Sequence, residues 1–266
     1  MKQASRLSRA LQTSLKAGLV GILVLLFLIP VGMIREVRSE RERYRADALA
    51  DVSSKAGGRT LLTAPFLAVP VRWEARETNA KGEIVQRTRR EVFIVFPESL
   101  DLSIDTRVDL RHRGIYAVPV HRADAVLNLE YTFRVSETGI SGAWVDWADT
   151  RLHYPYDDSR SLRESPVLTG PGRVRSVLRS SAPPVELASR SVSAPVPLSP
   201  GPSGEARLAV RLDLALSGAE ALRFLVLGDA NTVRLSCDWA SPSFAGYRLP
   251  AERDLGESGL DRKSVV

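Results

Sequence analysis

The chain has 266 residues, of which 44% are hydrophobic and 26% are charged, proportions typical of a globular protein with a buried core. This composition excludes collagen-like, low-complexity and wholly disordered chains. The formal net charge is +6, and residues 1–45, with nine Lys or Arg and three Glu, carry all of that excess. The rest of the chain is balanced, so composition indicates no basic nucleic-acid surface and we predict no nucleic-acid partner.

The first element is an uncharged run of eighteen residues, 17–34, between Lys16 and Arg35. A helix of that length covers about 27 Å, close to the ~30 Å hydrocarbon core of a bilayer. Basic residues on both sides match anionic lipid head groups. The run therefore predicts a transmembrane helix with the lipid bilayer as its partner, after a short basic tail over residues 1–16.

A cleaved signal peptide is the rival interpretation of this run. Its apolar region would be shorter and would end at a small-x-small cleavage site, whereas this run ends Pro30-Val-Gly-Met-Ile34. Both flanks are basic, so the charge count alone leaves the orientation open. Residues 35–55 are predicted to continue as a juxtamembrane helical stalk, on which Arg38 and Glu42 form an i,i+4 surface pair.

From Thr60 to residue 260 the hydrophobic period changes to two, which indicates strands with one buried face. The alternation is clearest over 127–135 and 208–216 and weaker over 102–110. It predicts a mainly antiparallel, β-sandwich-like domain over residues 60–260. Further strand candidates are 66–77, 84–96, 114–120, 139–148, 174–178, 222–227 and 232–239.

The turn signal Asn79-Ala-Lys-Gly82 predicts a hairpin between the candidate strands 66–77 and 84–96. Short helices are expected near residues 160–164 and 218–223. The single cysteine, Cys237, cannot close an internal disulfide, and its alternation with neighbouring apolar residues favours a core position.

The three histidines, His112, His121 and His153, are too scattered for a recognisable metal motif. Surface or hydrogen-bonded structural histidines are the favoured interpretation. The chain has no phosphate-binding glycine loop and no nucleophile elbow, so we predict no catalytic residue, no metal and no cofactor.

Two further features could carry chemistry. The paired carboxylates Asp157 and Asp158 lie in a polar stretch and are interpreted as a solvated loop rather than a Ca²⁺ or acid/base site. Trp144 and Trp147, on opposite faces of the candidate strand 139–148, are interpreted as one rim and one core side chain rather than a sugar- or protein-binding pair. Neither feature supports a catalytic mechanism, so the protein is expected not to be an enzyme.

Six short segments, taken in their order and spacing, resemble the CreD family of bacterial inner-membrane proteins, described as cell-envelope integrity proteins. The resemblance runs from about residue 20 to residue 260, and no single segment is diagnostic. The segments are Leu28–Arg35, Glu40–Arg45, Ala64–Pro70, Phe96–Leu100, Arg113–Tyr116 and Trp239–Pro250.

The resemblance implies a location in the inner membrane, with the β-rich domain on the periplasmic side and the basic tail of residues 1–16 in the cytoplasm. It also implies an association with envelope stress and a two-component regulatory system. It implies no catalytic residues. Family members look about twice as long, with further membrane helices after the soluble domain. The family-like positions, whose role is unknown, are Pro30, Arg35, Tyr44, Arg45, Pro65, Pro70, Pro97, Glu98, Arg113, Gly114, Tyr116, Trp239, Pro242, Ser243, Phe244, Gly246 and Pro250.

The last six residues, 261–266, depart from the family pattern, which tends to continue with an aromatic residue and a Trp. One back-translation of these six residues matches a common sequencing-adapter sequence, and the next triplet of that sequence is a stop. We therefore expect a non-native read-through tail on a gene fragment that lacks the C-terminal membrane helices. A genuine stop after Val266 in clean genomic sequence would contradict this expectation.

Three classes of function remain open at this stage. The leading hypothesis is a non-enzymatic inner-membrane protein that supports cell-envelope integrity or stress tolerance. The alternative is a membrane-anchored periplasmic module that senses or binds a ligand or an envelope protein partner. An enzyme of envelope chemistry is the third class, and it would need convergent polar groups in a pocket.

Overall fold

The computed structural model describes residues 4–78, 82–184, 189–239, 242–246, 252–255 and 261–265. Contacts between residues divide the chain into two compact units. The first unit ends at Ala50, and the second begins at Asp51 and contains the strands. Each unit is described here by itself.

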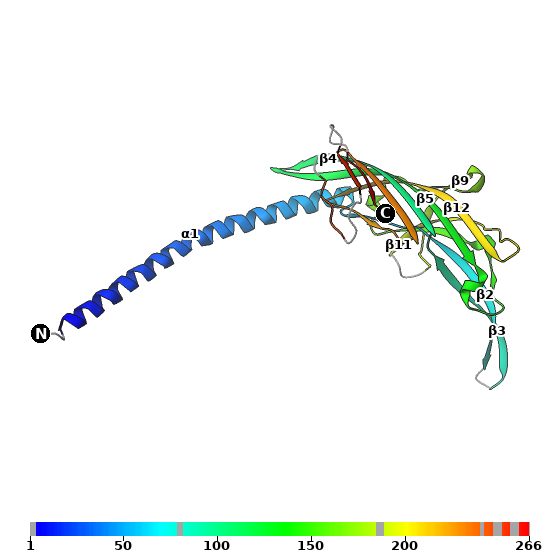
Figure 1. The fold of residues 1–266 in the computed structure, drawn as a ribbon, viewed down its shortest axis with the longest axis horizontal. Helices are drawn as coiled ribbons and strands as arrows, with labels where there is room; N and C mark the ends of the chain where they lie inside the picture. Colours follow the sequence, from blue (N-terminus) through cyan, green and yellow to red (C-terminus); the bar gives the residue numbers. More distant parts are fainter. Residues whose placement is uncertain are drawn as a thin grey trace. The chain divides into compact units, whose positions relative to one another are not determined.

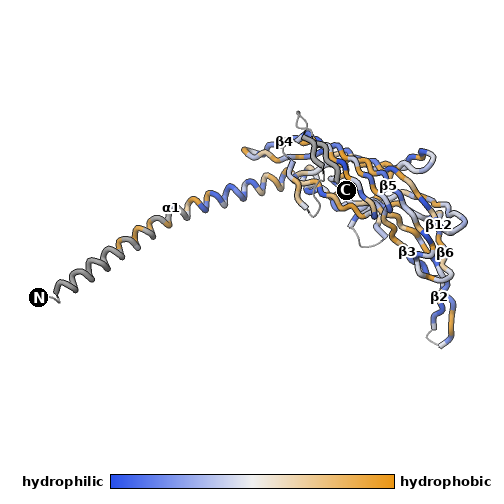
Figure 2. Tube along the Cα trace, in the orientation of Figure 1, coloured by the Kyte–Doolittle hydropathy of each residue, from blue (hydrophilic) through white to orange (hydrophobic). Residues whose placement is uncertain are grey.

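A single helix, α1 (Ala4–Ala56), accounts for the first unit and continues into the second. At about 1.5 Å per residue its 53 residues extend for about 80 Å. Figure 2 shows the helix changing from hydrophobic to hydrophilic towards its C-terminal end. The predicted surface pair is present on it, with 3.1 Å between Arg38 Nε and Glu42 Oε1.

No helix in the part of the chain that the structure describes is both long and apolar enough to cross a membrane. The described part of the predicted tail, residues 4–16, and the predicted membrane segment and stalk all fall on α1. Their division at residues 16, 34 and 55 stays a prediction.

The second unit is built mainly from two antiparallel sheets (Figure 1). In spatial order, the six-stranded sheet contains β10 (Arg179–Ser181), β11 (Arg190–Pro195), β7 (Arg151–Tyr156), β2 (Phe66–Thr78) and β3 (Ile84–Val95), with β6 (Trp144–Val145) added to β2. The eight-stranded sheet contains β15 (Glu252–Leu255), β16 (Asp261–Val265), β14 (Ala230–Cys237), β4 (Ser99–Arg113), β5 (Tyr116–Arg134), β12 (Glu205–Ala219), β8 (Val167–Thr169) and β9 (Arg175–Val177).

Two strand pairs are parallel: β14 with β4, and β1 (Thr60–Thr63) with β13 (Leu222–Leu225). Four short 3₁₀ helices are found in the described residues of this unit: η1 (Val135–Thr138), η2 (Trp147–Asp149), η3 (Ser159–Ser161) and η4 (Pro171–Arg173). The pairing of β5 with β12 is the longest non-local one: it runs from Ala219 opposite Val120 to Glu205 opposite Arg134. Figure 1 shows these two strands side by side along the sheet.

The two sheets share one hydrophobic core, as the period-two pattern predicts. Along β5 every second residue from Ala123 to Phe133 is buried, and along β12 the same holds from Ala206 to Leu216. These side chains form one cluster with Leu67 and Val69 of β2 and Leu152 of β7, which belong to the other sheet. The prediction of a mainly antiparallel, sandwich-like domain is confirmed.

The predicted hairpin is also confirmed, because β2 and β3 pair from Leu67 opposite Val95 to Thr78 opposite Ile84. Most of its turn, residues 79–81, lies outside the described residues. Cys237 is buried at the end of β14, as predicted.

Two local predictions are wrong. The candidate strand 139–148 contains only the two strand residues of β6, because Gly139 and Gly142 adopt φ of 66° and 70°, which an extended strand does not allow. The helix expected over 218–223 is instead the turn between β12 and β13, in which Glu220 adopts φ of 70°. The other expected helix, 160–164, is reduced to the 3₁₀ turn η3.

The β4–β5 hairpin extends beyond the core. Its ladder continues to Arg113 opposite Tyr116, whereas the neighbouring strand β14 ends opposite Thr106 and β12 ends opposite Val120. All five residues from Asp109 to Arg113 are exposed. Gly114, at φ of 59°, makes the tight turn that closes this ribbon.

We predict that Gly218→Ala destabilises the domain by about 1–3 kcal/mol, as overpacking does. A Cβ at Gly218 would lie 2.0 Å from Thr60 Oγ1 and 2.8 Å from the Gly58 carbonyl oxygen. Urea unfolding measures the change. Gly201→Ala is the matched control, because its Cβ would meet its nearest atom at 3.6 Å; equal stability of the two variants would contradict the prediction.

Candidate functional site

The end of α1 enters the β domain through a set of contacts that converge from four distant parts of the chain. We call this set the helix-end cluster. Its members are Asp51, Ser53, Ser54, Arg59, Thr60, Arg113, His121, Arg160 and Glu220.

The outer contacts of the helix-end cluster involve the last two turns of α1. Arg113, at the tip of the β4–β5 ribbon, places Nε 3.0 Å from Asp51 Oδ2. Arg160 of η3 donates from its guanidinium to the main-chain oxygen of Ser54. These two contacts join the helix to loops that lie about 60 and 110 residues further along the chain.

The helix stops because two glycines follow it. The amides of Gly57 and Gly58 both donate to the Ser53 carbonyl, each at 3.0 Å, and Gly57 adopts φ of 101°. A Cβ at Gly57 would meet the backbone of Arg160 and Ser161 at 3.0–3.1 Å. The end of the helix therefore lies directly against η3, with no space for a larger residue.

Glu220 connects the helix end to the turn between β12 and β13. Its carboxylate accepts from Arg59 Nε at 2.9 Å and from Ser53 Oγ at 3.4 Å. Beside it, the Ala219 amide donates to the Gly58 carbonyl at 2.6 Å. Because Glu220 holds a left-handed conformation that non-glycine residues rarely adopt, these contacts have to compensate for local strain.

The innermost contact of the cluster is buried. Thr60 Oγ1 donates to the Ser217 carbonyl at 2.9 Å and lies 3.3 Å from His121 Nε2. Since the hydroxyl has only one hydrogen and gives it to Ser217, His121 Nε2 has to carry the donating hydrogen. Burial lowers the pKa of His121 to about 4, so the ring is neutral at pH 7.

The second buried histidine has a structural environment. His153 stacks on Phe66 with ring centroids 5.5 Å apart, and its Nδ1 lies 3.2 Å from Ser191 Oγ. Burial lowers its pKa to about 4, and the charge of Arg151 adds to that effect. Ser191 in turn donates to the Ser181 carbonyl at 3.0 Å, so its hydroxyl hydrogen is used in holding two strands together. His112 is exposed on the ribbon.

The other sequence-level candidates are separated in space or already paired. Asp158 accepts from the Arg160 amide at 2.9 Å and from the Arg160 guanidinium, and these bonds lower the pKa of its carboxyl group. Trp147 packs edge-on against Phe133 with centroids 6.0 Å apart, while Trp144 is 44% exposed. The core and rim interpretation of the two tryptophans is therefore confirmed, although only Trp144 lies on a strand.

No group of three or more His, Cys, Asp or Glu side chains suited to a metal ion occurs among the residues with described positions. The helix-end cluster itself consists of hydrogen bonds and ion pairs that hold backbone segments together. Chemically, it can fasten a helix to a domain, and its one titratable buried group can respond to acid.

The family-like positions are spread over the fold. Pro30, Arg35, Tyr44 and Arg45 lie on α1, where the Tyr44 hydroxyl donates to Glu40 at 3.3 Å. Arg113 joins the helix-end cluster, and Gly114 and Tyr116 lie beside it at the ribbon turn.

Four of these positions lie where strands begin or pair. The Pro65 carbonyl accepts from the buried Tyr131 hydroxyl at 3.0 Å, and the Pro70 carbonyl accepts from the Asp146 amide at 2.9 Å. The Pro97 carbonyl accepts from the Asp229 amide, and Glu98 accepts from Thr132 Oγ1 at 2.7 Å. These four positions therefore anchor the loops between strands.

The remaining family-like positions follow β14. The Trp239 amide contacts Cys237 Sγ at 3.4 Å, and Pro242, Ser243, Phe244 and Gly246 lie in an irregular segment. Pro250 lies outside the described residues. No functional role is assigned to any of these family-like positions, and their functional importance is untested.

Most of the helix-end cluster was not anticipated from the sequence. Thr60 and Ser217 are 157 residues apart, and nothing in either local pattern links them. The one usable signal was Gly57-Gly58, a helix stop after the stalk.

We predict that the free energy of unfolding decreases as the pH falls from about 6.5 to about 4. The folded state binds protons at His121 and His153 with a pKa near 4, whereas the unfolded chain binds them near pH 6.5, so protons favour unfolding in this window. Urea titrations at several pH values measure the slope. His121→Gln should reduce the slope, and the exposed control His112→Gln should leave it unchanged; the opposite result would contradict this assignment.

Comparison with known proteins confirms the resemblance to the CreD family. The pattern of the family described as "Inner membrane protein CreD" matches residues 12–263. The inner membrane protein CreD of Escherichia coli (strain K12) is 29% identical over 238 residues, which cover 89% of this chain and 51% of that protein. The chain thus spans about half the length of the curated relative it matches. With the family match covering α1 from residue 12 and nearly the whole β domain, the chain belongs to the CreD family of inner membrane proteins.

Proposed function

We propose that this protein is held in the inner membrane by residues 17–34, carries its β domain on the periplasmic side, and supports cell-envelope integrity without catalysing a reaction. The family match over residues 12–263 carries this proposal, because it includes both the apolar run and the β domain and assigns them to an inner-membrane protein. This chain covers 51% of its relative, so any activity or partner of the whole relative is only proposed for this chain.

The anchoring role is supported by the composition of the run and by its helical backbone. Twelve of its eighteen residues are Leu, Ile, Val or Phe, and at roughly −0.5 kcal/mol each they favour insertion by about −6 kcal/mol. The backbone is helical throughout this run and continues for about 20 residues beyond it. All backbone groups inside a bilayer have to be hydrogen-bonded internally, which a continuous helix provides.

A non-catalytic role is supported by the hydrogen bonding of the two buried histidines. His121 and His153 are each hydrogen-bonded to a hydroxyl that itself holds a neighbouring strand. A general base needs access to a substrate proton, and both rings are less than 10% exposed. The contacts of the helix-end cluster likewise hold backbone segments of the second unit together, which supports a structural role for its polar side chains.

We expect the double variant Leu23→Arg/Leu26→Arg to detach the protein from membranes. Each Arg near the centre of a membrane helix costs about 2.5–3.5 kcal/mol, so two offset the estimated driving force of the run. Alkaline extraction of membranes followed by immunoblotting measures the bound fraction. Ser39→Arg/Ala46→Arg, on the stalk of the same helix, is the control and should remain bound; retention of both variants would argue against residues 17–34 as the anchor.

The orientation is tested by a reporter placed after Gly259. Alkaline phosphatase fused there should be active, because it folds only outside the cytoplasm, and a β-galactosidase fusion at the same residue should be inactive. The reverse pair of activities would place the β domain in the cytoplasm and overturn the periplasmic assignment.

The integrity role is tested in a deletion strain exposed to detergents and envelope-active toxins. We expect lower survival than in the parent strain, with recovery when the gene is supplied on a plasmid. The detached Leu23→Arg/Leu26→Arg variant should fail to restore survival. Survival of the deletion strain equal to that of its parent would reject the integrity role while leaving the anchoring result intact.

A further inference from the structure

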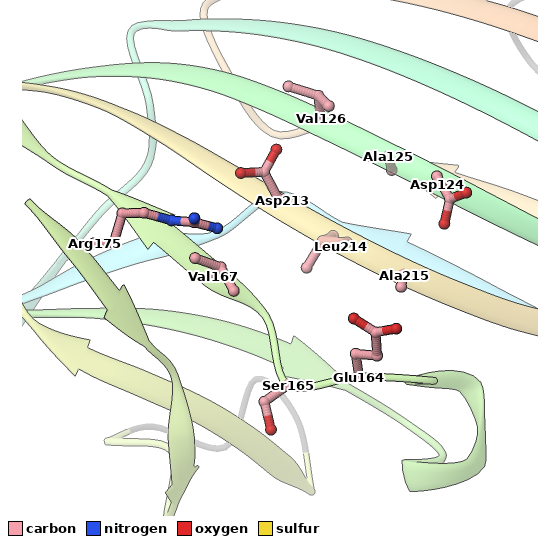
Figure 3. A pocket seen from close by; sticks show the side chains of 10 residues that line it. All are labelled: Asp124, Ala125, Val126, Glu164, Ser165, Val167, Arg175, Asp213, Leu214 and Ala215. Atoms are coloured by element: carbon pink, nitrogen blue, oxygen red, sulfur yellow. The ribbon is translucent and has the colours of Figure 1, made fainter. Parts of the chain in front are cut away.

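A hollow with a cavity volume of about 270 Å³ lies on the β domain where β5 and β12 meet the segment that leads into β8. Figure 3 shows the side chains around it, with Arg175 on one side and Glu164 on the other. The hollow is separate from the helix-end cluster, with which it shares no member. Its volume lies just below the range of about 300–1,000 Å³ that is typical of sites for drug-sized molecules, so only a smaller ligand fits.

The floor of the hollow is formed at outward-facing positions of the eight-stranded sheet. Asp124 and Val126 of β5, and Asp213 and Ala215 of β12, alternate with the buried core residues of those strands. Because Ala215 has only a methyl group, the sheet surface is low at this point. The ladder of β5 and β12 fixes the floor in place.

One wall is formed by main chain that is hydrogen-bonded at both ends. Leu162 bridges to Leu216, and the Arg163 amide donates to the Ala215 carbonyl at 2.8 Å. The chain rejoins β12 where Val167 lies opposite Asp213. Between these points Glu164 and Ser165 leave the ladder and border the hollow, so the wall is formed without any ligand present.

Two of the carboxylates at the hollow are already neutralised. Arg163 Nη2 lies 3.0 Å from Asp124 Oδ1, and Arg211 Nη2 lies 2.8 Å from Asp213 Oδ1. Within the described parts of the chain, neither Glu164 nor Arg175 forms an ion pair or a side-chain hydrogen bond. The hollow therefore presents one unpaired carboxylate and one unpaired guanidinium that do not pair with each other.

We propose that this hollow binds a small zwitterion, a free amino acid or a dipeptide, with the ligand's ammonium group at Glu164 and its carboxylate at Arg175. A guanidinium forms paired hydrogen bonds with a carboxylate, and a carboxylate accepts strongly from an ammonium group. Val126 and Val167, whose side chains are only partly buried, supply apolar contact between these two ends. A purely anionic ligand would leave Glu164 unpaired, and a purely cationic one would leave Arg175 unpaired.

The binding test uses the full-length chain in detergent micelles and alanyl-alanine as the probe, with calorimetric titration as the readout. Wild type should bind the dipeptide saturably. N-acetyl-alanyl-alanine, which lacks the ammonium charge, and alanyl-alanine amide, which lacks the carboxylate, should each bind about tenfold more weakly, because each loses one charged hydrogen-bonded contact.

The variants assign each end of the ligand. Glu164→Gln should weaken dipeptide binding about tenfold and remove the difference between the dipeptide and its N-acetyl form. Arg175→Gln should do the same for the amide form. Glu91→Gln and Arg111→Gln, which remove exposed charges elsewhere on the domain, are the matched controls and should bind like wild type.

The shape of the hollow is tested separately from its charge. Ala215→Leu raises the floor without changing any charge and should reduce binding, with circular dichroism confirming that the sheet is intact. Absence of saturable binding by wild type, or equal losses in the control variants, would overturn the proposal. Since this readout is binding alone, its failure would leave the anchoring and envelope-integrity experiments unaffected.

Discussion

The close approach of Gly218 to Thr60 is the contact on which the arrangement of the β domain depends. It lets the chain leave the helix, pass β12 and begin β1, which then pairs in parallel with β13. The same approach buries Thr60 and His121, so a hydroxyl, a carbonyl and an imidazole are satisfied together away from water. A side chain at Gly218 would push β1 away from β12. The contacts that stabilise the strained conformation of Glu220 in the adjacent turn would then be lost.

Local alternation was sufficient to predict the character of the second unit. The buried residues of β5 and β12 follow the period-two pattern almost without exception, because one face of each strand packs on the other sheet. The alternation of 102–110 is weaker in the sequence, and its outer end leaves the core: Leu110 is 48% exposed on the ribbon. The pattern therefore indicated where a strand exists, whereas only the structure shows that its apolar face is uncovered at Leu110.

Contacts between segments that are far apart in the sequence could not be predicted from local alternation. Arg113 meets Asp51, and Glu220 meets Arg59, across separations of 62 and 161 residues, and no periodicity encodes such pairs. The hollow was missed for the same reason. Glu164 and Arg175 are ordinary charged residues in the sequence. The course of the chain between Leu162 and Val167 places Glu164 at the hollow, and the β8–β9 pairing, with Arg175 opposite Thr169, places Arg175 there. The strand predicted over 139–148 failed because two glycines adopt positive φ there, which composition alone does not reveal.

The helix-end cluster has an exposed outer layer and a buried inner layer. The Arg113–Asp51 pair has side chains that are 62% and 34% exposed, so mobile ions reach it and screen it within about 8 Å at physiological ionic strength. The Thr60 and His121 contacts are enclosed and uncharged at neutral pH, so salt has little influence on them. A rise in the ionic strength around the domain would thus weaken the Arg113–Asp51 contact between the ribbon and the helix, while the strands at its base stay joined. The attachment of the helix is graded in this way, with an outer part that the surrounding solution can adjust and an inner part that it cannot.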